Sequence, residues 1–279
     1  MDLSLEETKR LKEIEIDILK SFISVCEKLN LKYYVVGGTL IGAVRHRGFI
    51  PWDDDIDVSM PRKDFNKFIK LGQAYLPSEL FIQTYETDPE CPFNYAKIRK
   101  SDTTFIETSG RNLNINKGIF IDVFPLDNYP QGKIKSSLVQ FVNKVYLIAI
   151  GRKFFQDTKT LKLRFNQAIS KIILPSSYKA LIQRDKFIQS FTKSKLSNNF
   201  CGMYGKKEIA PWDWYGDGVE FKFEDITVKA PLEYDKYLRN IYGDYMQLPP
   251  KEKRVPIHDT DIIDLNKSYK HYINDKSED

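Results

Sequence analysis

The sequence predicts an α+β fold in which a mixed sheet flanked by helices precedes a mainly helical second half. Three observations predict this fold. Apolar residues near the N-terminus have helical spacing, short apolar runs bounded by turns occupy residues 33–124, and a lysine-rich stretch of helical character begins near residue 133. With 42% hydrophobic and 13% aromatic residues, the 279-residue chain can form a packed core.

An amphipathic helix is predicted first, because apolar residues recur at steps of three and four: Leu11, Ile14, Ile18, Phe22, Val25 and Leu29. Ser4 and Glu7 have the spacing of a capping box at its start. Tyr33–Val36 is predicted to be a buried strand that ends at Gly37-Gly38. Thr39–Arg45 then opens a second helix, whose amides would face any phosphate bound at that turn.

Strands and helices alternate in the next segment. After a loop at Pro51-Trp52, Asp55–Met60 is a predicted strand, and a helix follows from Arg62 to Tyr75, behind Pro61. Four further strands are expected, at Phe81–Gln83, Tyr95–Arg99, Thr104–Ile106 and Ile119–Phe124.

The composition changes after Pro130. Two or three lysine-rich helices are expected over residues 133–195, with Pro175 as one break. A Trp- and Tyr-rich segment, Met203 to Tyr215, precedes a hairpin at Glu220–Phe223 and Ile226–Lys229. A helix is then predicted from Pro231 to Tyr242, with Gly243 as its C-cap, and the tail from Lys276 is expected to fray.

Domain organisation and cellular setting follow from the same features. No repeat or linker is apparent, so residues 1–279 are expected to form one unit, with a core over about 30–128 and a helical, aromatic-rich substrate or acceptor region over about 131–275. Three distant cysteines, an acidic N-terminus unlike a signal peptide, and no apolar run of roughly 20 residues favour a cytoplasmic protein, peripheral at most to the inner membrane face.

Clustered carboxylates are the strongest chemical signal. If Asp55–Met60 is a strand, Asp55 and Asp57 point the same way while Ile56 and Val58 face a core, and Asp53 joins the row if the strand begins early. Adjacent carboxylates repel each other, and a cation between them relieves this repulsion. Oxygen ligands suit Mg²⁺ or Mn²⁺, so we predict a metal-dependent phosphate-transfer site.

Asp122 is the second signal, since it is a single carboxylate in the apolar run Ile119–Phe124. A bare buried charge would cost several kcal/mol, which a metal or a general-base role would explain. A strand end or a local cap is the structural alternative. With Asp55 and Asp57, Asp122 would complete a three-carboxylate cluster on neighbouring strands.

At this point four segments resemble the LicD family, which includes bacterial phosphocholine transferases and has the fukutin-related enzymes as relatives. The segments are Gly38–His46, Phe49–Val58, Gly118–Asp127, and Tyr242–Met246 with Pro249-Pro250. The resemblance spans about residues 30–258 and implies a nucleotidyltransferase-like core. In that core a Gly-Gly turn (Gly37, Gly38) precedes an Asp-x-Asp strand (Asp55, Asp57), and a later strand supplies Asp122.

The resemblance implies a metal-dependent transfer of a phospho-alcohol, with phosphocholine expected, from a CDP-linked donor to a hydroxyl of a cell-surface glycan, teichoic acid or lipopolysaccharide precursor, with release of CMP. Asp55, Asp57 and Asp122 are the expected catalytic and metal-binding residues, with Asp122 holding metal or accepting the proton. The expected substrate-binding residues are Gly37, Gly38, Thr39, Arg45, His46, Trp52, Asp53, Lys97 and Arg99. Arg47 is a further candidate cation.

Several of these residues have an ordinary explanation. Any one cation, taken alone, is typical of a surface, and His46 and His258 are typical of loop or capping residues. Trp52 is expected to fix the carboxylate loop, with cytosine stacking as an alternative. Trp212, Trp214, Tyr204 and Tyr215 could cage a quaternary ammonium group, although such clusters more often belong to a core.

The charge distribution suggests a further partner. Residues 131–195 contain 14 Lys/Arg and two Asp, a net charge of +12, so the remainder, with 29 basic and 36 acidic residues, carries −7. Such a block attracts an acidic surface (anionic lipid, nucleic acid or a phosphate-rich polymer), and the alternative is a set of solvated helix faces. Nucleic acid is not an expected partner.

Two other functions remain open from the sequence. One is a nucleotidyltransferase that acts on a small acceptor with pyrophosphate release. The other is a non-catalytic glycan- or membrane-binding protein that uses the basic block. Clustered carboxylates argue against the second, because a binding module gains nothing from them.

Overall fold

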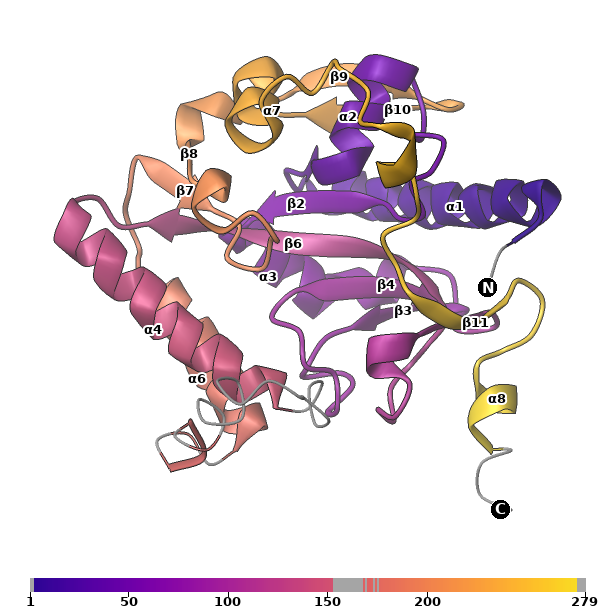
Figure 1. The fold of residues 1–279 in the computed structure, drawn as a ribbon, viewed down its shortest axis with the longest axis horizontal. Coiled ribbons are helices and arrows are strands. Elements are labelled where there is room, and N and C mark those ends of the chain that lie inside the picture. Colours follow the sequence, from indigo (N-terminus) through magenta and orange to yellow (C-terminus); the bar gives the residue numbers. More distant parts are fainter. Residues whose placement is uncertain (1–2, 153–167, 169, 173, 175, 275–279) are drawn as a thin grey trace.

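The computed structural model describes residues 3–152, 168, 170–172, 174 and 176–274. Its centre is a curved mixed sheet with helices packed against it, which confirms the predicted α+β class (Figure 1). The strand order is β1-β2-β6-β4-β3, and β7 and β8 extend the sheet from the far end of β6. These strands are β1 (Tyr34–Val35), β2 (Asp57–Pro61), β3 (Leu80–Gln83), β4 (Ala96–Lys100), β6 (Ile119–Tyr129), β7 (Leu196–Asn198) and β8 (Ala210–Pro211).

Strand directions matter for the site. β2 runs parallel to β6, whereas β1–β2, β4–β6 and β3–β4 are antiparallel pairs. Two small ladders lie outside the sheet. One is the predicted hairpin of β9 (Val219–Phe223) and β10 (Ile226–Ala230), and the other pairs β5 (Thr104–Glu107) with β11 (Thr260–Asp264).

Helices cover the sheet and extend beyond its edge. α1 (Leu5–Leu29) contacts β4 and β6, and α3 (Arg62–Leu71) contacts β2 and β6, while α2 (Gly37–His46) packs on β2 and β9. α4 (Lys133–Gly151) and α6 (Ser177–Gln189) pack against each other at the side of the molecule (Figure 1). Two further α-helices are α7 (Tyr234–Tyr242) and α8 (Lys270–Asn274).

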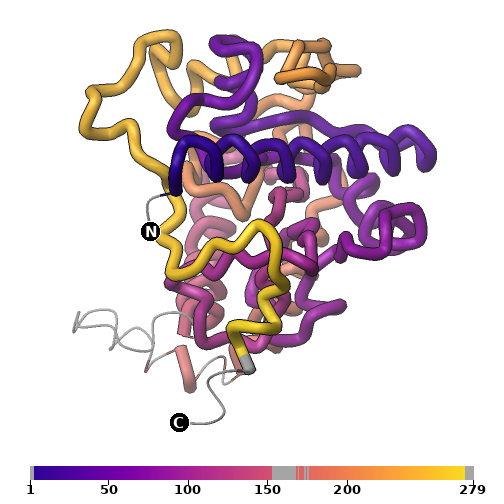
Figure 2. The backbone as a smooth tube through the Cα atoms, turned by 90° about the vertical axis from the view of Figure 1, so that its right-hand side faces the viewer, coloured from indigo at the N-terminus to yellow at the C-terminus, as the bar shows by residue number. Residues whose placement is uncertain are grey.

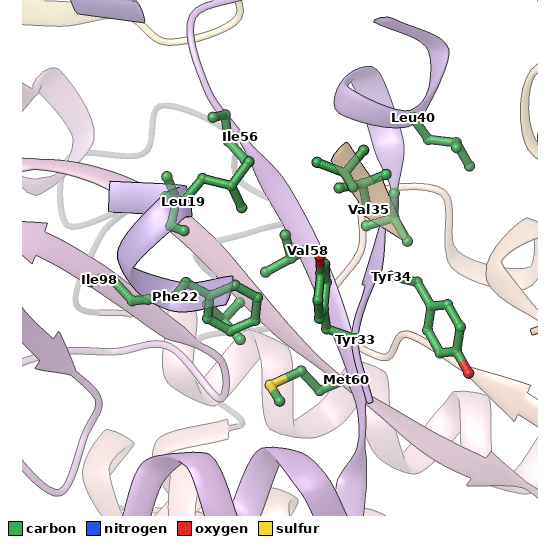
Figure 3. Close-up of a cluster of buried hydrophobic side chains, with 14 of the residues drawn as sticks. Leu19, Phe22, Tyr33, Tyr34, Val35, Leu40, Ile56, Val58, Met60 and Ile98 are labelled. Atoms are coloured by element: carbon green, nitrogen blue, oxygen red, sulfur yellow. The ribbon is translucent and has the colours of Figure 1, made fainter. Parts of the chain in front are cut away.

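The hydrophobic core lies between α1 and the sheet. Figure 3 shows Leu19 and Phe22 of α1 facing Val58 and Met60 of β2 and Ile98 of β4. The Phe22 ring makes edge contacts with Tyr33 and Phe68, each at 5.3 Å between ring centroids. Near the N-terminal end of α1, Arg10 donates a hydrogen bond to Asn266, so the C-terminal segment runs beside this helix (Figure 2).

Most predicted elements form, with shifted ends. The Ser4–Glu7 capping box is confirmed, and Ile56 and Val58 are fully buried. The strand predicted from Asp55 begins only at Asp57, because pairing with β6 starts at that residue. The helix predicted to reach Tyr75 ends at Leu71 and continues as a 3₁₀ turn.

The second half combines helices with short strands. α4 and α6 are two of the predicted lysine-rich helices, whereas Pro175 and the tail from Lys276 lie outside the described residues. The helix predicted from Pro231 begins at Tyr234 and ends before Gly243, as expected. β7, β8, β11 and α8 had no sequence signal, since three are strands of five residues or fewer and α8 has a single turn and a half.

Phe22→Ala tests the core. We expect a loss of about 3–5 kcal/mol in the free energy of unfolding, because an aromatic ring with no solvent exposure is replaced by a cavity. Urea unfolding measures this loss. Leu5→Ala is the control, since Leu5 is 92% exposed and should change stability by less than about 0.5 kcal/mol. Equal losses in the two variants would contradict the packing described here.

Candidate active site

The register of the sheet brings three predicted residues together. Asp57 on β2 lies directly beside Asp122 on β6, and Asp122 lies beside Lys97 on β4. Neighbouring strands are about 4.8 Å apart, so the three side chains form one row across the sheet. Asp57, Asp122 and Lys97 all line one cavity of about 190 Å³, together with Asp53 and Asp55.

The Gly-Gly turn closes the cavity on the side of α2. Gly37 has φ +58°, and a Cβ there would lie 2.5 Å from Asp57 Oδ2. A Cβ on Gly38 would overlap Asp53 Oδ2. Both positions therefore require glycine for the backbone to approach the carboxylates this closely. Thr39 supports the same arrangement, because its hydroxyl accepts a hydrogen bond from the Asp57 amide (2.8 Å).

The first turn of α2 presents backbone amides to this side of the cavity. Its N-cap residue, Val36, has no side chain that can cap the helix, and the first intrahelical bond is donated by Leu40. The amides of Gly37, Gly38 and Thr39 precede that bond, so the helix does not use them. Such a helix end is suited to bind the oxygens of a phosphate.

Asp53, Asp54 and Asp55 form a second carboxylate group just before β2. One oxygen from each lies within 4.8 Å of the others, and Asp53 Oδ2 is buried with no hydrogen-bond partner among the described residues. Asp54 accepts hydrogen bonds from the amides of Ile257 and His258. The loop that carries the carboxylates is therefore tied to the C-terminal segment.

Burial and mutual repulsion disfavour the charged form of these carboxylates and so raise their pKa values. Burial, with a further contribution from Asp55, raises the pKa of Asp53 to about 7. Burial raises the pKa of Asp55 to about 6, against the opposing charge of His258. The pKa of Asp57 is raised well above its ordinary value by burial and by Asp55 and Asp122. A divalent cation would relieve this repulsion, and the cluster offers the carboxylate oxygens that Mg²⁺ and Mn²⁺ prefer.

Lys97 and His258 supply positive charge beside the carboxylates. Lys97 Nζ lies 3.0 Å from Asp122 Oδ1 and 3.8 Å from Glu107, and its side chain is only 2% exposed. His258 Nδ1 lies 3.3 Å from Asp54. Burial alone would lower the pKa of His258, but the Asp54 carboxylate, which accepts from its ring, and the charge of Asp55 raise it to about 9.

The other predicted cations lie outside the cavity lining. The Arg45 side chain donates a hydrogen bond to the Tyr245 carbonyl. Arg99 is buried and donates hydrogen bonds to the Gln83 side chain and the Gly118 carbonyl. His46 closes the last turn of α2 and Arg47 is its left-handed C-cap. Trp52 lines a different cavity on the far side of Asp53 and Asp54, where the Arg254 guanidinium lies 5.5 Å from its ring.

Aromatic side chains form another part of the cavity lining, which we call the aromatic chamber. Tyr204 and Tyr242 meet at 4.9 Å between ring centroids, and three further aromatic residues and one carboxylate line the same space. They are Tyr95, Phe124, Tyr237 and Glu208. Burial raises the pKa of Glu208 to about 7.

Only part of the predicted cage belongs to this chamber. Tyr204 lines it, but Trp212, Trp214 and Tyr215 pack against the hydrophobic core, as the structural alternative expected. The indole of Trp212 donates a hydrogen bond to Asn128 (2.9 Å). Sequence reasoning missed Tyr95 as a site residue, although it precedes Lys97 by two residues, immediately before β4. Tyr242 was noted in the sequence only as part of the segment Tyr242–Met246 and not as a site residue.

Comparisons with known proteins agree with this geometry. Residues 30–163 match the sequence model described as "LicD/FKTN/FKRP, nucleotidyltransferase domain". The chain is similar to the lipopolysaccharide cholinephosphotransferase LicD of Haemophilus influenzae, with 29% identity over 87% of this chain and 92% of that protein. It is also similar to the mouse ribitol 5-phosphate transferase FKRP, with 40% identity over 40% of this chain and 20% of that protein.

Gly38→Ala tests the close approach of the turn to the carboxylates. Because the new methyl group would overlap Asp53 Oδ2, Asp53 must move, and we expect Mn²⁺ affinity to fall by roughly 10- to 100-fold. Isothermal titration calorimetry measures this affinity. Gly110→Ala is the matched control, since a Cβ there meets no atom within 4 Å. Unchanged affinity in Gly38→Ala would place the metal elsewhere.

The raised pKa values predict how stability depends on pH in the metal-free protein. The folded state holds protons on Asp53 and Asp55 more strongly than the unfolded chain does, where the pKa of an aspartate is about its ordinary 3.8. The stability of the folded protein should therefore fall as pH rises from about 4 through 7. At pH near 8, Asp57→Asn should raise the unfolding midpoint in EDTA, by roughly 2–4 °C for each kcal/mol of repulsion relieved. Exposed Asp213→Asn is the control. A lower midpoint for Asp57→Asn would contradict the repulsion.

Proposed function

The chain belongs to the LicD family and is a transferase of that family, and we propose that it transfers phosphocholine from CDP-choline to a glycan hydroxyl, releasing CMP. The acceptor is proposed to be a cell-surface glycan, such as a teichoic acid or lipopolysaccharide precursor. One observation carries the proposal: a single cavity joins a carboxylate cluster suited to a metal–diphosphate to an aromatic chamber suited to choline.

We propose that Mg²⁺ or Mn²⁺ is held by Asp55, Asp57 and Asp122. Bound there, the ion would offset the negative charge that develops on the phosphate during transfer. Asp53 is a further available ligand, because its Oδ2 is buried without a partner among the described residues. The Gly37-Gly38 turn lets the backbone amides of α2 approach the same phosphates.

The transfer itself needs a proton acceptor and a balanced charge. The acceptor oxygen attacks the distal phosphorus in line, a new P–O bond forms, and the bond to the bridging oxygen breaks as CMP leaves. Asp122 is proposed either to complete the metal site or to take the hydroxyl proton, since burial raises its pKa above the ordinary value. Lys97, 3.0 Å from Asp122, supplies a fixed positive charge beside the transferred phosphate.

The aromatic chamber supports choline as the transferred alcohol. A quaternary ammonium group has no hydrogen-bond donor and binds best against aromatic faces and a negative charge. Tyr204, Tyr237 and Tyr242 supply the rings, and Glu208 supplies a buried carboxylate. The similarity to a cholinephosphotransferase, which extends over most of both chains, favours the same alcohol. A polyol such as ribitol would gain less from these rings.

CMP release tests the donor and the chemistry together. With Mg²⁺, CDP-choline should support faster release than CDP-ribitol or CDP-glycerol, and Asp55→Asn should abolish release while Asp213→Asn retains it. Tyr204→Ala should lower kcat/KM for CDP-choline by roughly 2- to 30-fold, the range of one cation–π contact. Tyr75→Ala is the matched control, because Tyr75 is 48% and Tyr204 38% exposed.

Three other outcomes would each contradict a different part of the proposal. Pyrophosphate release from CTP, with no CMP from any CDP-alcohol, would indicate nucleotidyl transfer. A clear preference for CDP-ribitol would keep the phosphotransfer and reject choline. CMP release by Asp55→Asn at the wild-type rate would reject the proposed role of the carboxylates.

A further inference from the structure

An apolar stripe on α4 is exposed to solvent beside the catalytic cavity. Ile134, Leu138 and Phe141 recur at steps of four and three, so they share one helix face. They are 87%, 59% and 67% exposed, respectively. Among the described residues, no other helix has three large apolar side chains with such exposure on one face.

Positive charge surrounds this stripe. Lys133, Lys135 and Lys144 are all exposed, and the sequence of α4 contains no acidic residue. In the neighbouring helix α6, the one acidic residue, Asp185, is buried and pairs with Arg62 at 3.2 Å. We call these six residues, Ile134, Leu138, Phe141, Lys133, Lys135 and Lys144, the α4 face.

Part of the basic block has another role. Arg184 is only 2% exposed and donates hydrogen bonds to Asn143, Asn94 and the Phe200 carbonyl, so it fixes the α4–α6 pair to the catalytic half. The charge available to a partner therefore comes from the exposed lysines.

A groove connects the α4 face with the catalytic cavity. Phe141, Lys144 and Leu147 of α4 line this groove of about 440 Å³. Asn199, Gly202 and Met203 line both the groove and the cavity that holds the carboxylates. Met203 is itself 75% exposed, so apolar surface continues from α4 to the mouth of the cavity.

We propose that the α4 face binds an anionic membrane surface and so holds the catalytic cavity beside an acceptor carried on lipid. Exposed apolar side chains flanked by lysines are the pattern of a helix that lies in the plane of an anionic bilayer. Within the parts of the chain that the structure describes, none of the helices could span a bilayer. The lipid-borne acceptor rests on the proposed function; the membrane binding does not.

Vesicle co-sedimentation of the full chain tests the proposal. Wild type should bind vesicles of phosphatidylcholine with phosphatidylglycerol much better than phosphatidylcholine alone, and binding should weaken between about 0.1 M and about 1 M salt, as screening shortens from roughly 10 to 3 Å. Replacing Lys133, Lys135 and Lys144 together by Ser should reduce the partition coefficient on the order of 100-fold. The control replaces exposed Lys9, Lys222 and Lys251 by Ser.

A second pair of variants separates a membrane from a soluble polyanion. Leu138→Ser with Phe141→Ser should also weaken vesicle binding at least about tenfold, since both side chains would enter the interface. The control is Leu5→Ser with Leu232→Ser, because both leucines are more than half exposed elsewhere. Binding that depends on the lysines but not on Leu138 and Phe141 would assign the face to a soluble polyanion and overturn the proposal.

Three other results would overturn it. These are equal binding to neutral and anionic vesicles, wild-type binding by the triple lysine variant, and the same loss in the control variants. CMP release in solution, without vesicles, is measured on the same preparations. If the protein releases CMP from CDP-choline but does not bind anionic vesicles, the membrane proposal is overturned and the proposed function is retained.

Discussion

Electrostatic repulsion among buried carboxylates is the constraint on which the rest of this structure depends. Asp57 and Asp122 are adjacent because β2 and β6 pair in parallel at that register, and Asp53 and Asp55 enter the same cavity from the preceding loop. The sheet core thus holds in place charges that would separate in a free chain. Fold stability and the acidic cluster are linked through Ile56 and Val58, which flank Asp57 and are fully buried.

Two positively charged side chains lie beside the carboxylate cluster, each next to different aspartates. Lys97 neutralises Asp122 from within the sheet, while His258 faces Asp54 and Asp55 from the C-terminal segment. The helix end at Gly37-Gly38 lies against Asp57 and Asp53 and has no side-chain cap. Under the proposed function, such a site would suit a metal together with an anion, because the amides at a helix N-terminus favour phosphate oxygens. The proposed cytidine diphosphate donor would supply that anion.

Much of this arrangement could be predicted from local patterns. Asp57 and Asp122 were recognisable because each interrupts an apolar strand, and the Gly-Gly turn because only glycine tolerates its approach. Contacts between distant segments had no such signal. Glu107 lies on β5, which pairs with β11, yet its carboxylate lies 3.8 Å from Lys97 of β4. Tyr237 and Glu208 arrive from the second half, and the Arg45 side chain bonds the Tyr245 carbonyl instead of entering the cavity.

Calorimetric titration of CDP-choline into the protein, with Mg²⁺ and then with EDTA, tests the account most directly. If the carboxylates and the helix end form one metal–diphosphate site, Mg²⁺ should strengthen donor binding by at least about tenfold, a coupling free energy of roughly 1.4 kcal/mol, and Asp57→Asn should remove that coupling. Donor binding of the same affinity with Mg²⁺ and with EDTA would contradict it.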